Sequence, residues 1–329
     1  MVEYWKSKLD KDEVDMYNRI CQGILAKKQN VTLSGCSDLQ NIVSVFKKVL
    51  HDHPEFYNAS PQVSAAASMF GIQLDLTYLY SQQQCSSMDR AYQALVQKYR
   101  SLAGAQEIEI EKVILSELVL NTQYEINSLY NQNAMSAIYH HKAQCSGFAL
   151  AFQWLMSHFG IWCISVSGQV RDPKTGTYFP HAWNIIRLSN QYYHVDPTMM
   201  LGANTQKTTP LSYHMVNCSD NTMKAAGYQW NFSSTPPCQQ DMDMSSVHHS
   251  DCPTFSRLYD LHTYVSNHLK QGDVTFSFIL NISQYNTDKL MHMITAIVQE
   301  KIQELNLNKS FRLTLMDNHY TIRLLQTAL

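Results

Sequence analysis

The sequence contains no Cys-x-x-Cys pair, no apolar run long enough to span a bilayer, and no dense run of Lys or Arg. The first absence removes the usual anchor of a structural zinc site. The second argues against a membrane-spanning helix. The third, together with a formal net charge of -2, argues against a nucleic-acid partner, because proteins that bind nucleic acid usually carry a concentrated basic face.

Disulfides are not needed to hold together a chain of 329 residues, so the eight cysteines are expected to be reduced thiols. The first residues, MVEYWK, have neither an apolar core nor a small-residue cleavage site, so we expect no signal peptide and predict a cytoplasmic protein. With 45% hydrophobic and 16% charged residues, the composition is that of a globular protein.

Apolar periodicity predicts an α+β protein in four parts. These are a mainly helical N-terminal region at 1–104, a core at 105–231, a polar linker at 232–253 and a small α+β unit at 254–329. The helices expected before Cys145 are 11–28, 87–102, 106–122 and one that Ser37-Asp38 would cap and that would end before Pro54. We expect a strand at 71–80. The last part reads as helix 254–270, strand 274–280, helix 286–305 and strands 310–315 and 320–325, the last two joined by a turn at Asp317-Asn318.

Cys145 opens the most informative segment. The residues after it repeat at helical spacing, and Gly160 is well placed to end the helix, whose apolar face is Phe148, Ala151, Phe152, Leu155 and Phe159. Cys145 is therefore expected at a helix N-terminus, where free N–H groups and the helix dipole stabilise a thiolate and make it a nucleophile. Gly147 would leave room for a substrate backbone to approach. A lone cysteine in this position is also consistent with a small buried hydrophobe.

Three strands follow, at 161–170, 181–188 and 192–196, separated by turns, and the last two form a hairpin. In an antiparallel pair the start of one strand lies near the end of its partner, so His181 and Asp196 are expected to meet. A carboxylate that accepts from one ring nitrogen fixes the tautomer of a histidine whose other nitrogen takes a thiol proton.

Three blocks together carry a family resemblance. The run Asn133 to Phe152, then Gly160-Ile161 and Gly168, then His181-Ala182-Trp183-Asn184, and finally His194-Val195-Asp196-Pro197-Thr198 resemble bacterial transglutaminase-like domains. The family pattern is Cys-x-Gly-(Tyr/Phe)-Ala, His-Ala-Trp-Asn and (Tyr/His)-Val-Asp-x-Thr. The earlier Asp52-His53-Pro54-Glu55-Phe56 also resembles a segment common in these proteins. Met199-Met200 departs from the more aromatic residues that often follow the last block.

The resemblance implies a papain-like core, in which a nucleophile helix packs on an antiparallel sheet. It implies Cys145 as nucleophile, His181 as general base and then acid, and Asp196 as the orienting carboxylate, with acyl transfer on protein or peptide amides as the reaction. No cofactor and no metal are expected. Gln144 and Tyr139 are weaker candidates for oxyanion or substrate contacts, although core packing is the simpler reading of Tyr139. Trp183 is expected on the face of His181, either shielding its bond to Asp196 or only packing in the core.

Three alternatives stay open at this point. Water as acceptor would make the protein a protease or amidase, which we favour, and an amine would make it a transglutaminase. A silent peptide-binding module of the same fold is the second alternative. The third is a zinc site drawn from an irregularly spaced set: His214, Cys218, Cys238, His248, His249 and Cys252.

Overall fold

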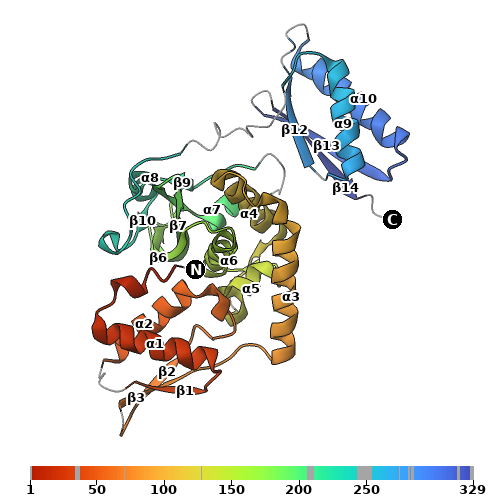
Figure 1. The fold of residues 1–329 in the computed structure, drawn as a ribbon. Coiled ribbons are helices and arrows are strands. Elements are labelled where there is room, and N and C mark those ends of the chain that lie inside the picture. The colour runs from red at the N-terminus through yellow and green to blue at the C-terminus, as the bar shows by residue number, and fades with distance from the viewer. Residues whose placement is uncertain are drawn as a thin grey trace. The chain divides into compact units, whose positions relative to one another are not determined.

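The computed structural model describes residues 2–33, 38–69, 71–126, 128–205, 211–242, 254–273, 275–280, 282, 285–316 and 319–326. These residues form two compact units. The first contains the described residues between 2 and 205 and between 213 and 242, and the second contains residues 211–212 and those from Thr254 onward (Figure 1). No helix in the described part of the chain is both long and apolar enough to cross a bilayer.

The first unit begins with two helices and a small sheet that share one apolar core. The strand order is β1-β3-β2, with both pairs antiparallel. Asp10 caps α1 in a reciprocal capping box with Glu13, and Asp38 caps α2 as predicted. The bounds are α1 Lys11–Leu25, β1 Asn30–Leu33, α2 Leu39–Asp52, β2 Ser64–Ser68 and β3 Gly71–Asp75. The predicted strand at 71–80 is thus shorter than expected.

Asp52, at the end of α2, ties the N-terminal segment to this core. The carboxylate is buried, and it accepts hydrogen bonds from the backbone N–H groups of Trp5 and Lys6 and from the Tyr17 hydroxyl, at 2.9–3.0 Å. Trp5 in turn donates its indole N–H to the backbone oxygen of Ser165, in the central sheet. The N-terminal segment is therefore anchored to α2 and to the sheet at once.

The helices that follow surround the predicted nucleophile. A short parallel pair of strands, β4 and β5, lies between them, and β5 leads directly into α6. The bounds are α3 Gln82–Lys98, α4 Glu107–Asn121, β4 Gln123–Tyr124, α5 Ala134–Ile138, β5 Lys142–Ala143 and α6 Cys145–His158.

A five-stranded antiparallel sheet in the order β10-β6-β7-β8-β9 forms the centre of the unit. Helix α6 packs on it, and the Asn184 amide of β7 donates to the Ala149 carbonyl of α6 at 2.9 Å. The expected α+β fold, with a nucleophile helix on an antiparallel sheet, is confirmed. The bounds are β6 Cys163–Arg171, β7 Tyr178–Leu188, β8 Gln191–Val195, α7 Pro197–Ala203, β9 Val216–Cys218, α8 Asp220–Ala225 and β10 Tyr228–Gln229.

Residues 232–242, the described part of the predicted linker, pack on this unit. Cys238 is 1% exposed, and its carbonyl accepts from the Asp220 N–H at 2.8 Å. The Asp241 carboxylate accepts from the Ser219 N–H. The remainder of the predicted linker, 243–253, lies outside the described residues. The four domain boundaries proposed above stay predictions.

The second unit is a four-stranded sheet with two helices. Its elements follow the expected order except that a short strand, β11, occupies the start of the helix predicted over 254–270. The strand order is β11-β12-β14-β13, and β13 and β14 form the predicted antiparallel hairpin, whose turn residues Asp317 and Asn318 lie outside the described residues. One apolar core joins both helices to the sheet. The bounds are β11 Thr254–Phe255, α9 Leu258–Gln271, β12 Thr275–Leu280, α10 Thr287–Glu304, β13 Lys309–Met316 and β14 His319–Gln326.

One carboxyl group in the first unit is buried without a full set of partners. Glu111 of α4 has no exposed surface, and one of its oxygens accepts from the Asn217 amide at 2.7 Å. Its other oxygen has no hydrogen-bond partner among the described residues. Burial raises the pKa of Glu111 to about 8, against the hydrogen bond from Asn217 and the charge of Lys112, which lower it.

Stability should therefore depend on pH through Glu111. The pKa of Glu111 is about 8 in the folded state against an ordinary value of 4.5, so folding takes up a proton at pH values between the two. Stability therefore falls as pH rises from 4.5 to about 8. A tenfold change in proton affinity corresponds to about 1.4 kcal/mol, so the effect amounts to a few kcal/mol. Glu111→Gln should raise the melting temperature at pH 8 and change it little at pH 5. Glu109→Gln, on the same helix, is the control, and an equal effect of both substitutions would contradict the assignment.

Candidate active site

Cys145 is the first residue of α6, as the apolar pattern predicts. Its side chain is partly exposed, while the apolar face of the helix behind it is buried in the core. Gln144 is the N-cap residue, and its side chain makes no capping hydrogen bond to the N–H groups of the first turn. These N–H groups, at the positive end of the helix dipole, can therefore stabilise negative charge beside the sulfur.

The space that Gly147 leaves open is used by the chain itself. A Cβ atom at this position would lie 2.2 Å from the Ser136 hydroxyl oxygen and 2.7 Å from the Asn131 carbonyl oxygen. The expectation that Gly147 admits a substrate backbone is therefore wrong. Its role is to let α6 pack closely against α5 and the turn before it, which places Cys145.

His181 and Asp196 meet as the hairpin predicts. His181 is on β7, Asp196 directly follows β8, and Nε2 of the imidazole lies 2.6 Å from Oδ2 of the carboxylate. Both side chains are buried, with exposed fractions of 7% and 0%. Asp196 is also the N-cap of α7, since its Oδ1 accepts from the N–H groups of Thr198 and Met199 at 2.9 Å. The carboxylate is thus held in place by the fold and aimed at the ring.

Electrostatics support an imidazolium at this position. Burial lowers the pKa of His181, but the Asp196 charge, the hydrogen bond to Asp196 and the hydrogen bond with Cys145 outweigh it and raise the pKa to about 10. For Asp196, burial raises the pKa, and the charge and hydrogen bond of His181, with the Tyr228 hydroxyl and the Met199 N–H, bring it below its ordinary value. The pair is therefore ionised near neutral pH.

Cys145 completes the group, because its thiol lies close enough to His181 to contribute to the raised pKa of that imidazole. Nε2 is occupied by Asp196, which leaves Nδ1 for the sulfur. The three residues that the sequence singled out therefore lie together, in the order sulfur, imidazole, carboxylate. This arrangement permits proton transfer between thiol and ring while the carboxylate fixes the ring.

Comparison with known protein families identifies the same region. Residues 93–197 match the family model described as the transglutaminase-like superfamily, and the match includes all three residues of the group. This part of the chain is transglutaminase-like.

Solved structures similar to the chain are distant. A crystal structure described as a TGase is 13% identical over 54% of this chain and 53% of that one, with a TM-score of 0.32. A putative cysteine protease from Cytophaga hutchinsonii is 11% identical over 54% and 69%, with a TM-score of 0.28. The periplasmic domain of TgpA from Pseudomonas aeruginosa is 15% identical over 42% and 57%, with a TM-score of 0.26. The matched region thus spans about half the length of the first of these, and the comparison with curated proteins gave no match.

Trp183 packs against the histidine of the transglutaminase-like core. Its ring is fully buried and stacks on the His181 ring, with 6.1 Å between centroids and 21° between planes. Gly168 makes room for it, because a Cβ there would lie 2.6 Å from the indole ring. The sequence left two roles open for Trp183, which were core packing and shielding of the His181–Asp196 bond. The observed position of its ring serves both roles.

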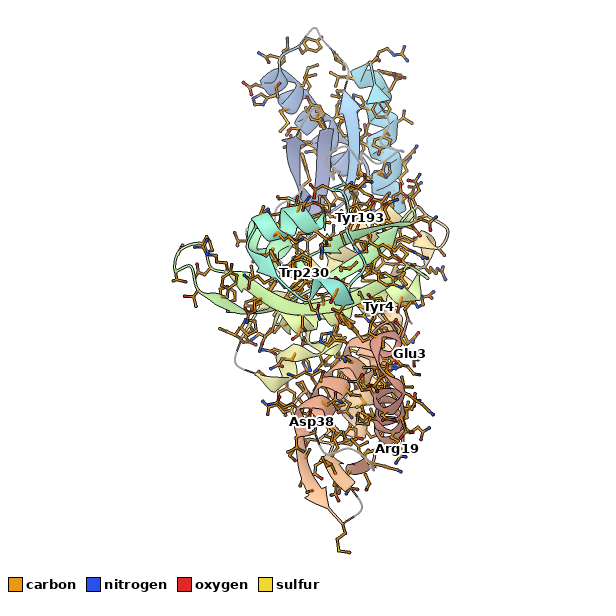
Figure 2. The ribbon with its side chains drawn as sticks, turned by 90° about the vertical axis from the view of Figure 1, so that its left-hand side faces the viewer. Glu3, Tyr4, Arg19, Asp38, Tyr193 and Trp230 are labelled. Atoms are coloured by element: carbon orange, nitrogen blue, oxygen red, sulfur yellow. The ribbon has the colours of Figure 1, made fainter. Side chains whose placement is uncertain are left out.

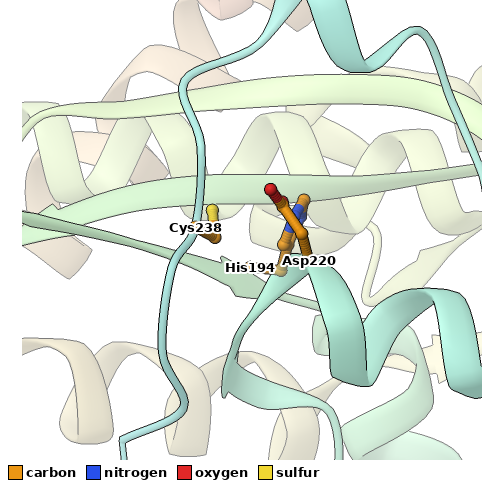
Figure 3. Close-up of side chains that lie close together, drawn as sticks. All are labelled: His194, Asp220 and Cys238. Carbon is orange, nitrogen blue, oxygen red and sulfur yellow. The ribbon is translucent and has the colours of Figure 1, made fainter.

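Trp183 is itself held by a second histidine. Its indole N–H donates to Nδ1 of His194 at 2.9 Å, and Nε2 of His194 lies 2.8 Å from Oδ1 of Asp220. Cys238 is close by, so that one ligand atom from each of His194, Asp220 and Cys238 lies within 4.8 Å of the others (Figure 3).

This cluster does not fit a metal ion. An indole N–H is only a donor, so Nδ1 of His194 must accept and the ring proton must be on Nε2, where it is donated to Asp220. A metal at Nε2 would need an imidazolate. Burial lowers the pKa of His194 and raises that of Cys238, so the ring is neutral and the thiol protonated. The cluster positions Trp183.

Three of the residues that the sequence suggested as zinc ligands lie in the described part of the chain, and they do not form a zinc site there. Cys218 and Cys238 are buried, and each sulfur donates to a backbone carbonyl, while His214 is exposed. His248, His249 and Cys252 lie outside the described residues.

The structure assigns no clear role to the two weaker site candidates, Gln144 and Tyr139. Gln144 is directly beside Cys145, and its amide donates to the Ser128 carbonyl at 3.4 Å. Tyr139, at the end of α5, is 40% exposed and contacts the His140 ring. Packing of Tyr139 in the core was the wrong expectation.

Two tyrosines near the group were missed from the sequence. The Tyr228 hydroxyl donates to Oδ2 of Asp196 at 2.7 Å from β10, 32 residues further along the chain. Tyr124, on β4, pairs with Ala143 just before Cys145. Its pKa is raised by burial and by the charges of Cys145 and Asp196, which places it beside the group. No motif marks either residue, because both positions depend on strand pairing between distant segments.

Proposed function

We propose that the protein is a thiol-dependent acyl transferase acting on protein or peptide amides, and that it works chiefly as a cysteine protease or amidase. The observation that carries the proposal is the group of Cys145, His181 and Asp196, in which a buried carboxylate is hydrogen-bonded to the imidazole and a partly exposed thiol lies near the ring.

The reaction follows from these positions. The Cys145 thiolate attacks the amide carbonyl carbon, and the carbonyl π electrons move to oxygen, where N–H groups at the start of α6 stabilise the charge. His181 then gives its Nδ1 proton to the amine, the C–N bond breaks, and a thioester remains on Cys145. Water or a second amine attacks the thioester, losing its proton to His181, and the thiolate returns. The acceptor decides between hydrolysis and cross-linking.

Thiol reactivity tests this proposal without a known substrate. We expect iodoacetamide near pH 6 to label Cys145 at least tenfold faster than Cys85, which is also partly exposed, and His181→Ala to remove that advantage, because the imidazolium stabilises the thiolate. Peptide mass spectrometry reads the rate at each cysteine. Equal rates at the two positions would leave a silent binding module of the same fold as the better account.

A further inference from the structure

A cavity of about 400 Å³ lies in the first unit, between the N-terminal segment, α2, β6 and the segment after β10. Tyr4 and Trp230, labelled in Figure 2, belong to two of the segments that meet here, and the Tyr4 hydroxyl donates to the Ser234 carbonyl at 2.7 Å. A volume of this size is in the range of small-molecule sites. None of Cys145, His181 and Asp196 lines it.

The cavity lies apart from the nucleophile along α6. The Gln153 amide donates to the carbonyl of His51, a lining residue, and Gln153 is eight residues after Cys145 in the helix. At 1.5 Å per residue, this places His51 about 12 Å along the helix axis from Cys145. The cavity is therefore a separate site in the same unit.

The charge around the cavity has one sign. Lys8, Lys47 and Lys48 line it, and no Asp or Glu does, although acidic residues outnumber basic ones in the chain as a whole. None of the three lysines has an ion-pair partner in the part of the chain that the structure describes. Lys8 lies over the Tyr4 ring, at 5.0 Å from its centroid, but none of the three ammonium groups faces a carboxylate of the described residues. Together they favour an anion, and most strongly one with two negative charges.

Other lining groups are already engaged. His51 has Ser165 and Ser167 on its two ring nitrogens, and burial with the charge of Lys47 lowers its pKa to about 4, so it is neutral. The indole N–H of Trp5 donates to Ser165, and that of Trp230 donates to Thr235. The indole groups therefore offer ring contact rather than donors, Trp5 from a partly exposed side chain and Trp230 from one that is 9% exposed. The lysines are the lining groups best able to bind a charged ligand.

From this combination we propose that the cavity binds a small phosphorylated aromatic compound of the mononucleotide class. Lysine ammonium groups hold the phosphate, and Trp5 and Trp230 contact the ring. The site does not depend on the acyl-transfer reaction proposed above. Trp230 packs edge-on against Trp183, at 5.7 Å between centroids, so a ligand here also lies one side chain away from the ring that covers His181.

Calorimetric titration with AMP tests the proposal on the full chain. We expect one saturable site, weakened by added NaCl, with adenosine and inorganic phosphate each binding at least tenfold more weakly because each lacks one half of the recognised group. The double charge reversal Lys47→Glu/Lys48→Glu should weaken AMP binding by more than tenfold. Lys174→Glu, in an exposed turn away from the cavity, is the matched control and should bind AMP as the parent does.

Absence of saturable AMP binding would overturn the proposal, as would equal binding by the parent and the double variant. Equal affinity for adenosine and AMP would also overturn it, because the lysines would then play no part. Far-UV circular dichroism checks that each variant is folded. If the double variant is not, Lys8→Glu, at an exposed position of the same cavity, provides the same comparison.

Discussion

Cys145→Ala is expected to lower the rate of acyl transfer by about 10⁴-fold or more, because the sulfur that forms the thioester is lost. A suitable substrate is fluorescently labelled casein, which offers both peptide bonds and glutamine side chains. Release of labelled peptides measures hydrolysis, and incorporation of a fluorescent amine into unlabelled casein measures cross-linking. The same variant should abolish both, since both pass through one thioester.

Cys85→Ala is the matched control, because Cys85 is also a partly exposed free thiol but lies at a distance from the group in the first turns of α3. It should leave both rates unchanged. Activity that survives Cys145→Ala, or that falls equally in the two variants, would contradict the assignment of Cys145 as nucleophile. The ratio of peptide release to amine incorporation by the parent protein decides between protease and transglutaminase.

Asp196→Asn is expected to lower the same rates by about 10³- to 10⁴-fold while the fold is kept. Asparagine can still accept from the Thr198 and Met199 N–H groups through its side-chain oxygen, so the cap of α7 survives. The other atom becomes an NH₂ group, which only donates and so can accept from neither His181 nor Tyr228. The negative charge that raises the pKa of His181 is also lost, while burial, which lowers it, remains.

Two further measurements separate this electrostatic role from a structural one. The labelling advantage of Cys145 at pH 6 should disappear in Asp196→Asn, because a neutral imidazole no longer stabilises the thiolate. Tyr228→Phe removes one of four hydrogen bonds to the same carboxylate and should cost only about tenfold in rate. If Asp196→Asn retained more activity than Tyr228→Phe, Asp196 would not be the orienting carboxylate.

Much of the site was predictable because its key residues lie at the ends of strongly patterned elements. The apolar spacing after Cys145 predicts a helix that begins there, and the structure has it. The hairpin between His181 and Asp196 follows from alternation and turn residues within 16 positions, so their meeting depends only on local pairing. Capping by Asp38 and the end of α2 before Pro54 are local in the same sense.

What could not be predicted depends on contacts between distant segments. Gly147 lies against Ser136 and Asn131, and Tyr228 reaches Asp196, only because separate elements pack on one another. The hydrogen bond from Trp183 to His194 fixes the position of a side chain that the sequence marked only as a packing candidate. The sequence does not specify this bond. Local sequence determines which backbone conformation a segment adopts, whereas the partner of a buried polar group is chosen by whichever distant donor or acceptor the core brings near.

The sequence by itself therefore determined the α+β class, the helix that begins at Cys145 and the hairpin that pairs His181 with Asp196. Only the tertiary structure decided that the sulfur meets that imidazole, that Tyr228 supports the carboxylate, and that three lysines gather around a cavity beside α2. The physical reason is the separation along the chain over which each effect acts. Backbone preference and apolar periodicity act over a few residues, while burial, hydrogen bonding and charge act between groups that only folding brings together.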